Sequence, residues 1–194
     1  MIPRAWAWTG ARARHDTMDQ PSKGRRLLIM RHAKSDWGTP GDRDFDRPLA
    51  KRGQRDAPRM GEWLLAQGLV PDLVLASPAR RAQETASKVC KVLDIGKQTV
   101  HWEPRIYDAT RADLIEVLAD CPTDRRLVLL VGHNPGLEEL LEYLVRGSGT
   151  LPAGDKTLPT AAVASVRVKA DWRKLTAGSG RIERWMCPRG LGDN

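Results

Sequence analysis

The sequence predicts an α/β fold, in the form of a three-layer α/β/α sandwich with a mostly parallel sheet and an antiparallel edge. Three short apolar runs, at residues 25–30, 73–76 and 127–131, have the length and composition of buried strands. Helical patterns separate them, and strands that alternate with helices build a mainly parallel sheet with helices on both faces. Two later stretches, 163–168 and 182–186, alternate apolar and polar residues, which is typical of antiparallel strands near a sheet edge.

The first helix is expected over residues 49–67. Met60 and Leu64 recur there at helical spacing, and Gly68 is a stop signal. Pro58 lies inside this stretch, so the helix either kinks at this proline or begins near it.

The second helix is expected to open at Ser77 as its N-cap, with Pro78 as the first helical residue, and to run to about residue 93. Asn134 is expected to open the last helix. The remaining expectations are an extended piece at 100–107, helices at 111–119 and 134–145, and loops rich in Gly and Pro at 35–48 and 147–160.

The length of 194 residues suits one α/β domain, and we expect it to span residues 25–190. We expect residues 1–24 to be a disordered N-terminal extension, with Met18 as an alternative natural start and a mitochondrial transit peptide as the competing interpretation. No apolar stretch approaches the roughly 18 to 20 residues of a membrane span. The three cysteines are widely spaced, which predicts neither a disulfide framework nor a metal motif and favours a cytoplasmic location.

The net charge of +8 is compatible with nucleic acid, an anionic membrane surface or a phosphorylated substrate. The chain has one Phe and two Tyr, and its basic residues are scattered in pairs, so stacking aromatics are not interleaved with a basic run. We therefore expect no nucleic-acid or membrane partner, and we interpret most basic residues as solvated.

Basic side chains follow three of the predicted strands. Arg31 and His32 come directly after the first strand, Arg81 lies in the first turn of the helix after the second, and His133 follows the third. Because parallel strands place their carboxyl ends at one edge of the sheet, these four side chains can converge there. Arginines grip phosphoryl oxygens bidentately, and a neutral imidazole is a good nucleophile toward phosphorus. The combination predicts a phosphoryl pocket.

Each of these residues also has an ordinary interpretation. A single histidine after a strand is usually a surface or core-edge residue, and a single arginine in a helix is usually solvated. His15 and His101 are assigned no role for that reason. Nearby arginines and a bound anion shift a histidine pKa in opposite directions, so the sequence does not fix the protonation of His32 or His133.

The sequence resembles the histidine phosphatase superfamily, with its phosphoglycerate-mutase-like fold, over about residues 25–190. The matching pieces are Leu28-Ile29-Met30-Arg31-His32-Ala33, Ser77-Pro78-Ala79-Arg80-Arg81-Ala82-Gln83-Glu84-Thr85 and Val131-Gly132-His133-Asn134-Pro135-Gly136. Within the superfamily it looks most like the SixA-type phosphohistidine phosphatases. That likeness is carried by Arg31-His32-Ala33-Lys34-Ser35, Asp46-Arg47-Pro48-Leu49, Lys51-Arg52-Gly53 and Gly132-His133-Asn134-Pro135-Gly136.

The resemblance implies a role for each site residue. His32 would be the nucleophile that becomes phosphorylated, Arg31 and Arg81 would hold the phosphoryl oxygens, and His133 would stabilise the transferring group. Arg80 would face solvent, since the arginine of the family pattern stands four residues after Ser77. The resemblance implies no metal and no cofactor.

The chain departs from the family pattern in two places. The first motif ends in Ala33 where the family most often has Gly, a small change that the SixA-like branch tolerates. Many members also carry a glutamate as general acid; the candidates here, Asp108 and Glu103, stand in no convincing motif. A phosphohistidine needs less acid assistance, because imidazole departs more easily than an alkoxide. Only about 20 residues separate Tyr107 from the strand at residue 127, which predicts an open pocket without a large lid.

These expectations lead to a metal-independent phosphatase that works through a phosphohistidine enzyme intermediate. The expected substrate is phosphohistidine in a protein. The alternatives are a small-molecule phosphomonoesterase of the same fold, acting on sugar or nucleotide-derived phosphates, and a non-catalytic phospho-ligand binding module. The sequence specifies no oligomeric state. Five tryptophans are expected to pack in or beside the core, and the aspartates of loop 35–48 to be solvated; they are Trp37, Trp63, Trp102, Trp172 and Trp185, and Asp36, Asp42, Asp44 and Asp46.

Overall fold

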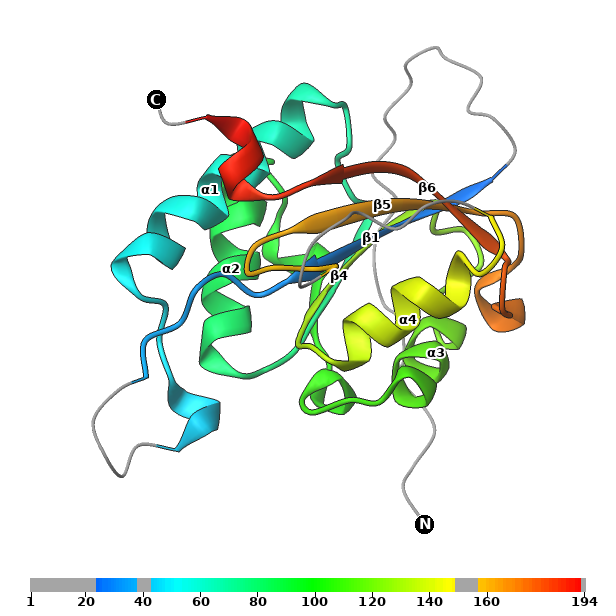
Figure 1. The fold of residues 1–194 in the computed structure, drawn as a ribbon, viewed down its shortest axis with the longest axis horizontal. Coiled ribbons are helices and arrows are strands. Elements are labelled where there is room, and N and C mark those ends of the chain that lie inside the picture. The colour runs from blue at the N-terminus through cyan, green and yellow to red at the C-terminus, as the bar shows by residue number, and fades with distance from the viewer. Residues whose placement is uncertain (1–23, 38–42, 149–156, 193–194) are drawn as a thin grey trace.

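The protein is built on one six-stranded sheet (Figure 1). A computed structural model describes residues 24–37, 43–148 and 157–192. The strands are β1 (Arg25–Arg31), β2 (Leu73–Ala76), β3 (Val100–Trp102), β4 (Leu127–Gly132), β5 (Val163–Val168) and β6 (Gly180–Met186). Their spatial order is β3-β2-β4-β1-β5-β6. The first four pair in parallel, and β5 pairs antiparallel with both β1 and β6, which confirms the predicted mostly parallel sheet with an antiparallel edge.

Helices cover both faces of the sheet and complete the predicted three layers. They are α1 (Lys51–Ala66), α2 (Arg80–Val92), α3 (Arg111–Ala119) and α4 (Gly136–Leu144). Alternate residues of β1 point to opposite faces, so Leu28 packs in the core under α1 and α2, and Leu27 packs in the core under α3 and α4. Both leucines are fully buried, and each such burial stabilises the fold by roughly 1.5–3 kcal/mol. The apolar runs of β1 and β4 therefore reflect strands that are covered on both sides.

Helix α1 continues through Pro58. The helix therefore does not begin at the proline, although Pro58 cannot donate the usual backbone hydrogen bond. Ala57, Met60 and Leu64 are all completely buried in the core shared with α2, and this packing holds the helix together on both sides of the proline.

The predicted start of α2 is wrong by two residues. The helix begins at Arg80, and Ala79, in extended conformation, is its N-cap. The Ser77 hydroxyl accepts a hydrogen bond from the Ala79 backbone N–H at 3.2 Å, but this bond closes a turn before the helix. Helix α4 likewise begins at Gly136 instead of Asn134, after a cis peptide between Asn134 and Pro135.

The five tryptophans that are expected to pack divide into two groups. Trp172 is fully buried, and Trp63 and Trp185 are partly buried against the core clusters. The expectation of packing is wrong for Trp37, which is 76% exposed, and for Trp102, which is 41% exposed. The Arg47 guanidinium stacks on the exposed Trp37 ring, 4.2 Å from its centroid.

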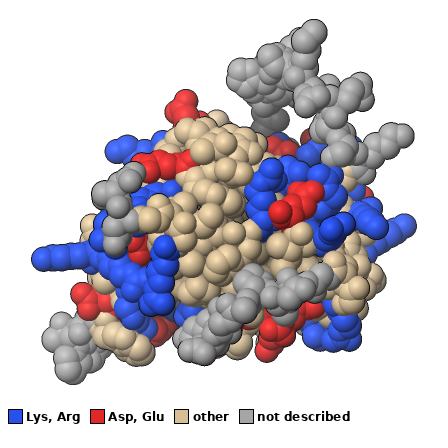
Figure 2. Space-filling model, turned by 45° about the horizontal axis from the view of Figure 1, so that its top comes forward, with Lys and Arg blue, Asp and Glu red and all other residues tan. Residues whose placement is uncertain are grey.

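The expected N-terminal extension lies outside the described residues except for Gly24. None of the helices in the described part of the chain combines the length and the hydropathy needed to span a bilayer. On the face drawn in Figure 2, Lys and Arg gather in separate groups with carboxylates beside them, and uncharged surface lies between the groups. The described basic residues on this face thus form separate patches and no single continuous basic surface.

Candidate active site

Three neighbouring strands end at the same edge of the sheet and place their next residues together. His32 follows β1, Ser77 follows β2 and His133 follows β4, which lies between them. The parallel ladder extends past the strands, since the His32 N–H donates to the Gly132 carbonyl and the Ser77 N–H to the Val131 carbonyl, both at 3.0 Å. As a result the His32 and His133 rings lie 5.1 Å apart between centroids, tilted by 53°.

The His32 ring is held by the chain itself. Its side chain is buried, and Nδ1 lies 2.8 Å from the Ala33 carbonyl oxygen. A carbonyl only accepts, so the ring hydrogen is on Nδ1 and the lone pair is on Nε2. The Ala33 N–H donates to Thr85 Oγ1 at 3.0 Å, and the Ala33 methyl is buried in the core under α1 and α2, which gives a packing reason for alanine at this position. The backbone thus leaves Nε2 as the ring nitrogen with the free lone pair.

The His133 ring is held by a side chain. Its Nε2 lies 2.8 Å from Ser77 Oγ, and its Nδ1 is buried with no hydrogen-bond partner among the described residues. The Tyr107 ring meets it edge-on at 5.7 Å. A buried ring nitrogen without a partner is costly, and it suits a site that receives a polar ligand.

Arg81 lies in the first turn of α2 and is buried. Its guanidinium donates to Asp44, from Nη1 to the backbone carbonyl at 2.6 Å and from Nη2 to the carboxylate at 2.9 Å. Arg80, one residue earlier, is exposed and pairs with Glu84 at 2.9 Å. Of the two adjacent arginines, the helix therefore directs Arg81 inward and Arg80 to solvent.

Arg31 reaches the site from the other face of β1. Its Nη1 donates to the Leu158 carbonyl at 3.1 Å, which also accepts from Asn134 Nδ2 at 3.0 Å. Its Nε is buried with no partner among the described residues. Burial lowers the pKa of Arg31, and the nearby Glu138 carboxylate opposes that shift.

Burial dominates the electrostatics of the two histidines. For His32, burial is opposed by the hydrogen bond to Ala33 and assisted by His133 and both arginines, which together lower the pKa to about 3. For His133, burial and Arg81 outweigh the opposing charge of Asp44 and lower the pKa to about 4. Both histidine rings are therefore neutral at physiological pH. The charges of Arg31 and Arg81 act on His32 and on His133 alike, so the structure brings the four predicted residues together.

Asp44 is a member of this site that sequence reasoning missed. It was expected to be a solvated loop residue, but its carboxylate accepts hydrogen bonds from Arg81, from Arg47 at 2.8 Å and from the Tyr107 hydroxyl at 3.1 Å. Phe45 packs edge-on against Tyr107 at 5.1 Å. The one available signal was the position of Asp44, two residues before the motif that starts at Asp46.

The two candidate general acids lie in other settings. Glu103 caps a turn at Arg105 and accepts from its guanidinium at 2.8 Å. Partial burial opposes ionisation of Glu103, but the Arg105 hydrogen bonds outweigh it and lower its pKa. Asp108 adopts a positive φ of 52°. Among the described residues, neither carboxylate forms a hydrogen bond with His32 or His133.

Comparison with known proteins decides the family. The model of the histidine phosphatase superfamily (branch 1) matches residues 27–109. The putative phosphohistidine phosphatase SixA of Nakamurella multipartitia has a TM-score of 0.72 and 28% sequence identity over 87% of this chain and 99% of its own. The chain belongs to the histidine phosphatase superfamily, and within it to the SixA type. It is a phosphatase, and its phosphoglycerate-mutase-like fold agrees with the sequence prediction.

Two sequence relatives extend the comparison. An uncharacterised protein of Mycobacterium tuberculosis is 34% identical over 82% of this chain and 100% of its own length. An uncharacterised chloroplastic protein of Arabidopsis thaliana is 34% identical over 69% of this chain, and the chain spans 66% of that relative.

Two glycines let helices approach loops beside the candidate site of this histidine phosphatase. A Cβ at Gly53, in the first turn of α1, would lie 2.1 Å from the Lys34 carbonyl oxygen, two residues after His32. A Cβ at Gly136, in the first turn of α4, would lie 2.1 Å from the Ala109 carbonyl oxygen. Glycine at these positions lets α1 pack against the loop that follows His32, and lets α4 begin against the segment that follows Tyr107.

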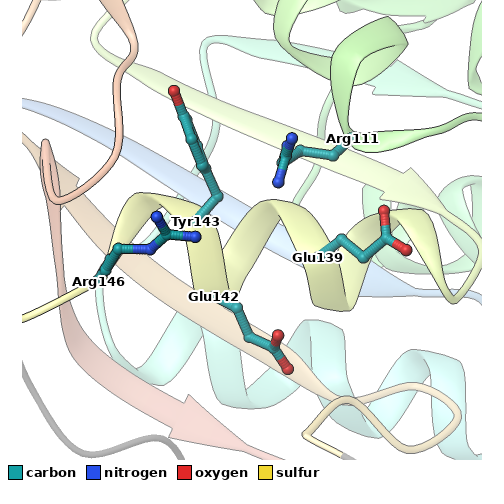
Figure 3. A pocket seen from close by; sticks show the side chains of 5 residues that line it. All are labelled: Arg111, Glu139, Glu142, Tyr143 and Arg146. Carbon is teal, nitrogen blue, oxygen red and sulfur yellow. The ribbon is translucent and has the colours of Figure 1, made fainter.

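A separate pocket of about 250 Å³ lies on the helical layer of α3 and α4 (Figure 3). It is lined by Arg111, Glu139, Glu142, Tyr143 and Arg146, and the Arg111 guanidinium stacks over the Tyr143 ring at 4.7 Å. None of the four predicted site residues lines it. Within the described ranges, no group of three or more His, Cys, Asp or Glu side chains is placed to hold a metal ion.

Proposed function

We propose that this histidine phosphatase dephosphorylates phosphohistidine in proteins, without a metal, through a phosphorylated His32. The observation that carries the proposal is the Nδ1 hydrogen bond of His32 to the Ala33 carbonyl, which leaves the Nε2 lone pair for attack beside two arginines and a second neutral histidine. The SixA-type structures support the choice of substrate, since the Nakamurella protein is described as a putative phosphohistidine phosphatase.

Each of the four site residues has its own role in the proposed phosphoryl transfer. The Nε2 lone pair of His32 forms a bond to phosphorus while the bond from phosphorus to the substrate nitrogen breaks, and that electron pair leaves with the substrate imidazole. Arg31 and Arg81 hold the phosphoryl oxygens, and His133 stabilises the charge that they carry in the transition state. Water then attacks phosphorus, the electron pair of the P–N bond returns to His32 Nε2, and both water hydrogens remain on the released phosphate.

The architecture also favours a protein substrate. The segment between Tyr107 and β4 is occupied by α3 and short turns, and α3 packs in the core with α4. Little of this segment is left to enclose a small metabolite, so a phosphorylated side chain on another protein has room to enter.

The test is phosphate release from a phosphohistidine peptide in EDTA, with native protein, His32→Ala and, as a matched control, His101→Ala on β3. We expect release by the native protein and the control and none by His32→Ala, with a mass increase of one phosphoryl group on His32 in quenched native enzyme. Full activity of folded His32→Ala would refute the mechanism. Hydrolysis of sugar or nucleotide phosphates but not of the peptide would select the small-molecule alternative, and phosphate binding without any hydrolysis would select the binding module.

A further inference from the structure

A carboxylate, that of Asp44, lies at the edge of the phosphoryl pocket, where it does not itself bind phosphate. Asp44 contacts Arg81 with both its backbone carbonyl and its carboxylate, and the Asp44 charge also acts on His133. A negative charge beside a pocket for a dianion repels the phosphoryl group itself. Arg81 and Arg47 offset part of this charge, and a cation on the substrate beside the phosphoryl group would offset it further.

Asp44 is ionised and has acceptor capacity to spare. Partial burial opposes ionisation, but hydrogen bonds from Arg47 and Arg81 outweigh it and lower the pKa of Asp44. An ionised carboxylate offers about four acceptor positions. Arg81, Arg47 and Tyr107 occupy three of them, and the side chain is still 51% exposed. Counted over the part of the chain that the structure describes, one acceptor position of Asp44 thus remains open to a ligand.

Aromatic rings flank this carboxylate. Phe45 follows Asp44 in the chain and meets the Tyr107 ring edge-on, with an interplanar angle of 79°. Tyr107 in turn contacts both Asp44, through its hydroxyl, and His133, through its ring. A carboxylate beside aromatic rings suits a flat cation, because the acid binds its N–H and the ring faces attract its charge.

We propose that Asp44, Phe45 and Tyr107 form the leaving-group subsite and select a substrate in which phosphorus is attached to a planar cationic ring, the imidazolium of phosphohistidine. The inference rests on the proposed function and adds the residues that choose the substrate. In the substrate one ring nitrogen carries phosphorus and the other carries a hydrogen, which is the group that Asp44 accepts.

This assignment fits the chemistry of departure. When the P–N bond breaks, its electron pair stays on the substrate nitrogen, and because the other nitrogen keeps its hydrogen, the group leaves as neutral imidazole. No separate general acid is then required. An ester whose leaving group carries a carboxylate would face Asp44 with like charge, so the same subsite disfavours it.

The test compares two substrates in Asp44→Asn, which keeps the shape of the side chain and removes its charge. We expect kcat/KM for a phosphohistidine peptide to fall at least about tenfold, and kcat/KM for p-nitrophenyl phosphate, whose leaving group is flat but carries no positive charge, to fall less than about threefold. The matched control is Asp46→Asn, which removes the same charge from a residue paired with Arg43 in the same turn, and which should leave both values unchanged.

The ratio of the two values decides the question. If Asp44 only positions Arg81, both substrates lose equally, and this result, or no loss at all, would overturn the proposal. If Asp44→Asn does not fold, Tyr107→Leu gives the same comparison, since it removes a ring and one hydrogen bond of the subsite. Native protein that hydrolyses p-nitrophenyl phosphate but no phosphohistidine would instead mark failure of the proposed function.

Discussion

The two buried histidines make the stability of the protein dependent on pH in a way that can be measured. Their folded-state pKa values, about 3 for His32 and about 4 for His133, lie below the ordinary value of 6.5. As the pH falls, the unfolded chain therefore binds protons before the folded chain does. Titration of the two histidines leaves the free energy of unfolding unchanged above pH 6.5. It lowers this free energy increasingly as the pH falls from 6.5 toward 4.

The size of the effect at pH 5 follows from linkage. At that pH the unfolded histidine is almost fully protonated and the folded one is almost fully neutral. At pH 5.0 the pH is about 1.5 units below the unfolded-state pKa of 6.5. Proton binding therefore stabilises the unfolded state relative to the folded state by about 2 kcal/mol for each histidine. Because both folded-state values lie well below 5, this figure depends mainly on the unfolded value.

The assay is urea unfolding at pH 7.5 and pH 5.0, in phosphate-free buffers, because a bound anion would itself shift both titrations. We expect His32→Gln and His133→Gln each to reduce the difference between the two pH values by about 2 kcal/mol relative to native protein, and the double variant to reduce it by about 4 kcal/mol. The comparison uses the pH difference, so the cost of each substitution at a single pH cancels. A single variant that keeps the full native difference would refute the assignment of a neutral buried ring at that position.

Three further predictions concern single residues. Arg81→Ala should lower kcat/KM roughly 100- to 1000-fold, whereas Arg80→Ala should stay near the native value, as steady-state kinetics on either substrate would show; equal losses would contradict the inward placement of Arg81. Ser77→Ala should lower kcat about tenfold with little change in stability beyond about 1 kcal/mol, because His133 loses its 2.8 Å partner; an unchanged kcat would exclude that contact from catalysis. Gly136→Ala should cost about 1–3 kcal/mol in urea unfolding, since its Cβ would lie 2.1 Å from a backbone carbonyl oxygen, and a stability equal to native would show that the helix can shift freely.

The fold and the four principal site residues could be predicted because their signals are local. The apolar runs of β1 and β4 exist because both sheet faces are covered, and a residue directly after a parallel strand is placed at the sheet edge by connectivity alone. His32 and His133 were found in this way. Arg81 was chosen over Arg80 by the spacing of a family motif, and the helix phase of α2 gives the physical reason, since it buries one of two neighbours.

The remaining site residues depend on contacts that no local pattern carries. Ser77 has the composition of an N-cap, but its hydroxyl is 2.8 Å from a histidine 56 positions away, and the helix starts three residues later. Asp44 lies in a polar loop that suggests solvation, yet it is fixed by Arg81, 37 positions away. In both cases a long-range hydrogen bond outweighs a local preference, and only the assembled sheet edge brings the partners together.

The two histidines differ in how their hydrogens are placed, and the difference matches their proposed tasks. A backbone carbonyl holds the hydrogen of His32 on Nδ1. Nε2 therefore carries a free lone pair before it attacks phosphorus and again after the phosphoryl group has been released. The hydroxyl of Ser77, which accepts from Ala79, can either donate to His133 Nε2 or accept from it. His133 Nδ1 can therefore present a hydrogen to a phosphoryl oxygen, or a lone pair to the attacking water, without any change of ring position. A nucleophile requires one fixed tautomer, and a residue that serves both half-reactions benefits from two, so a backbone partner for the first ring and a hydroxyl partner for the second follow from the chemistry.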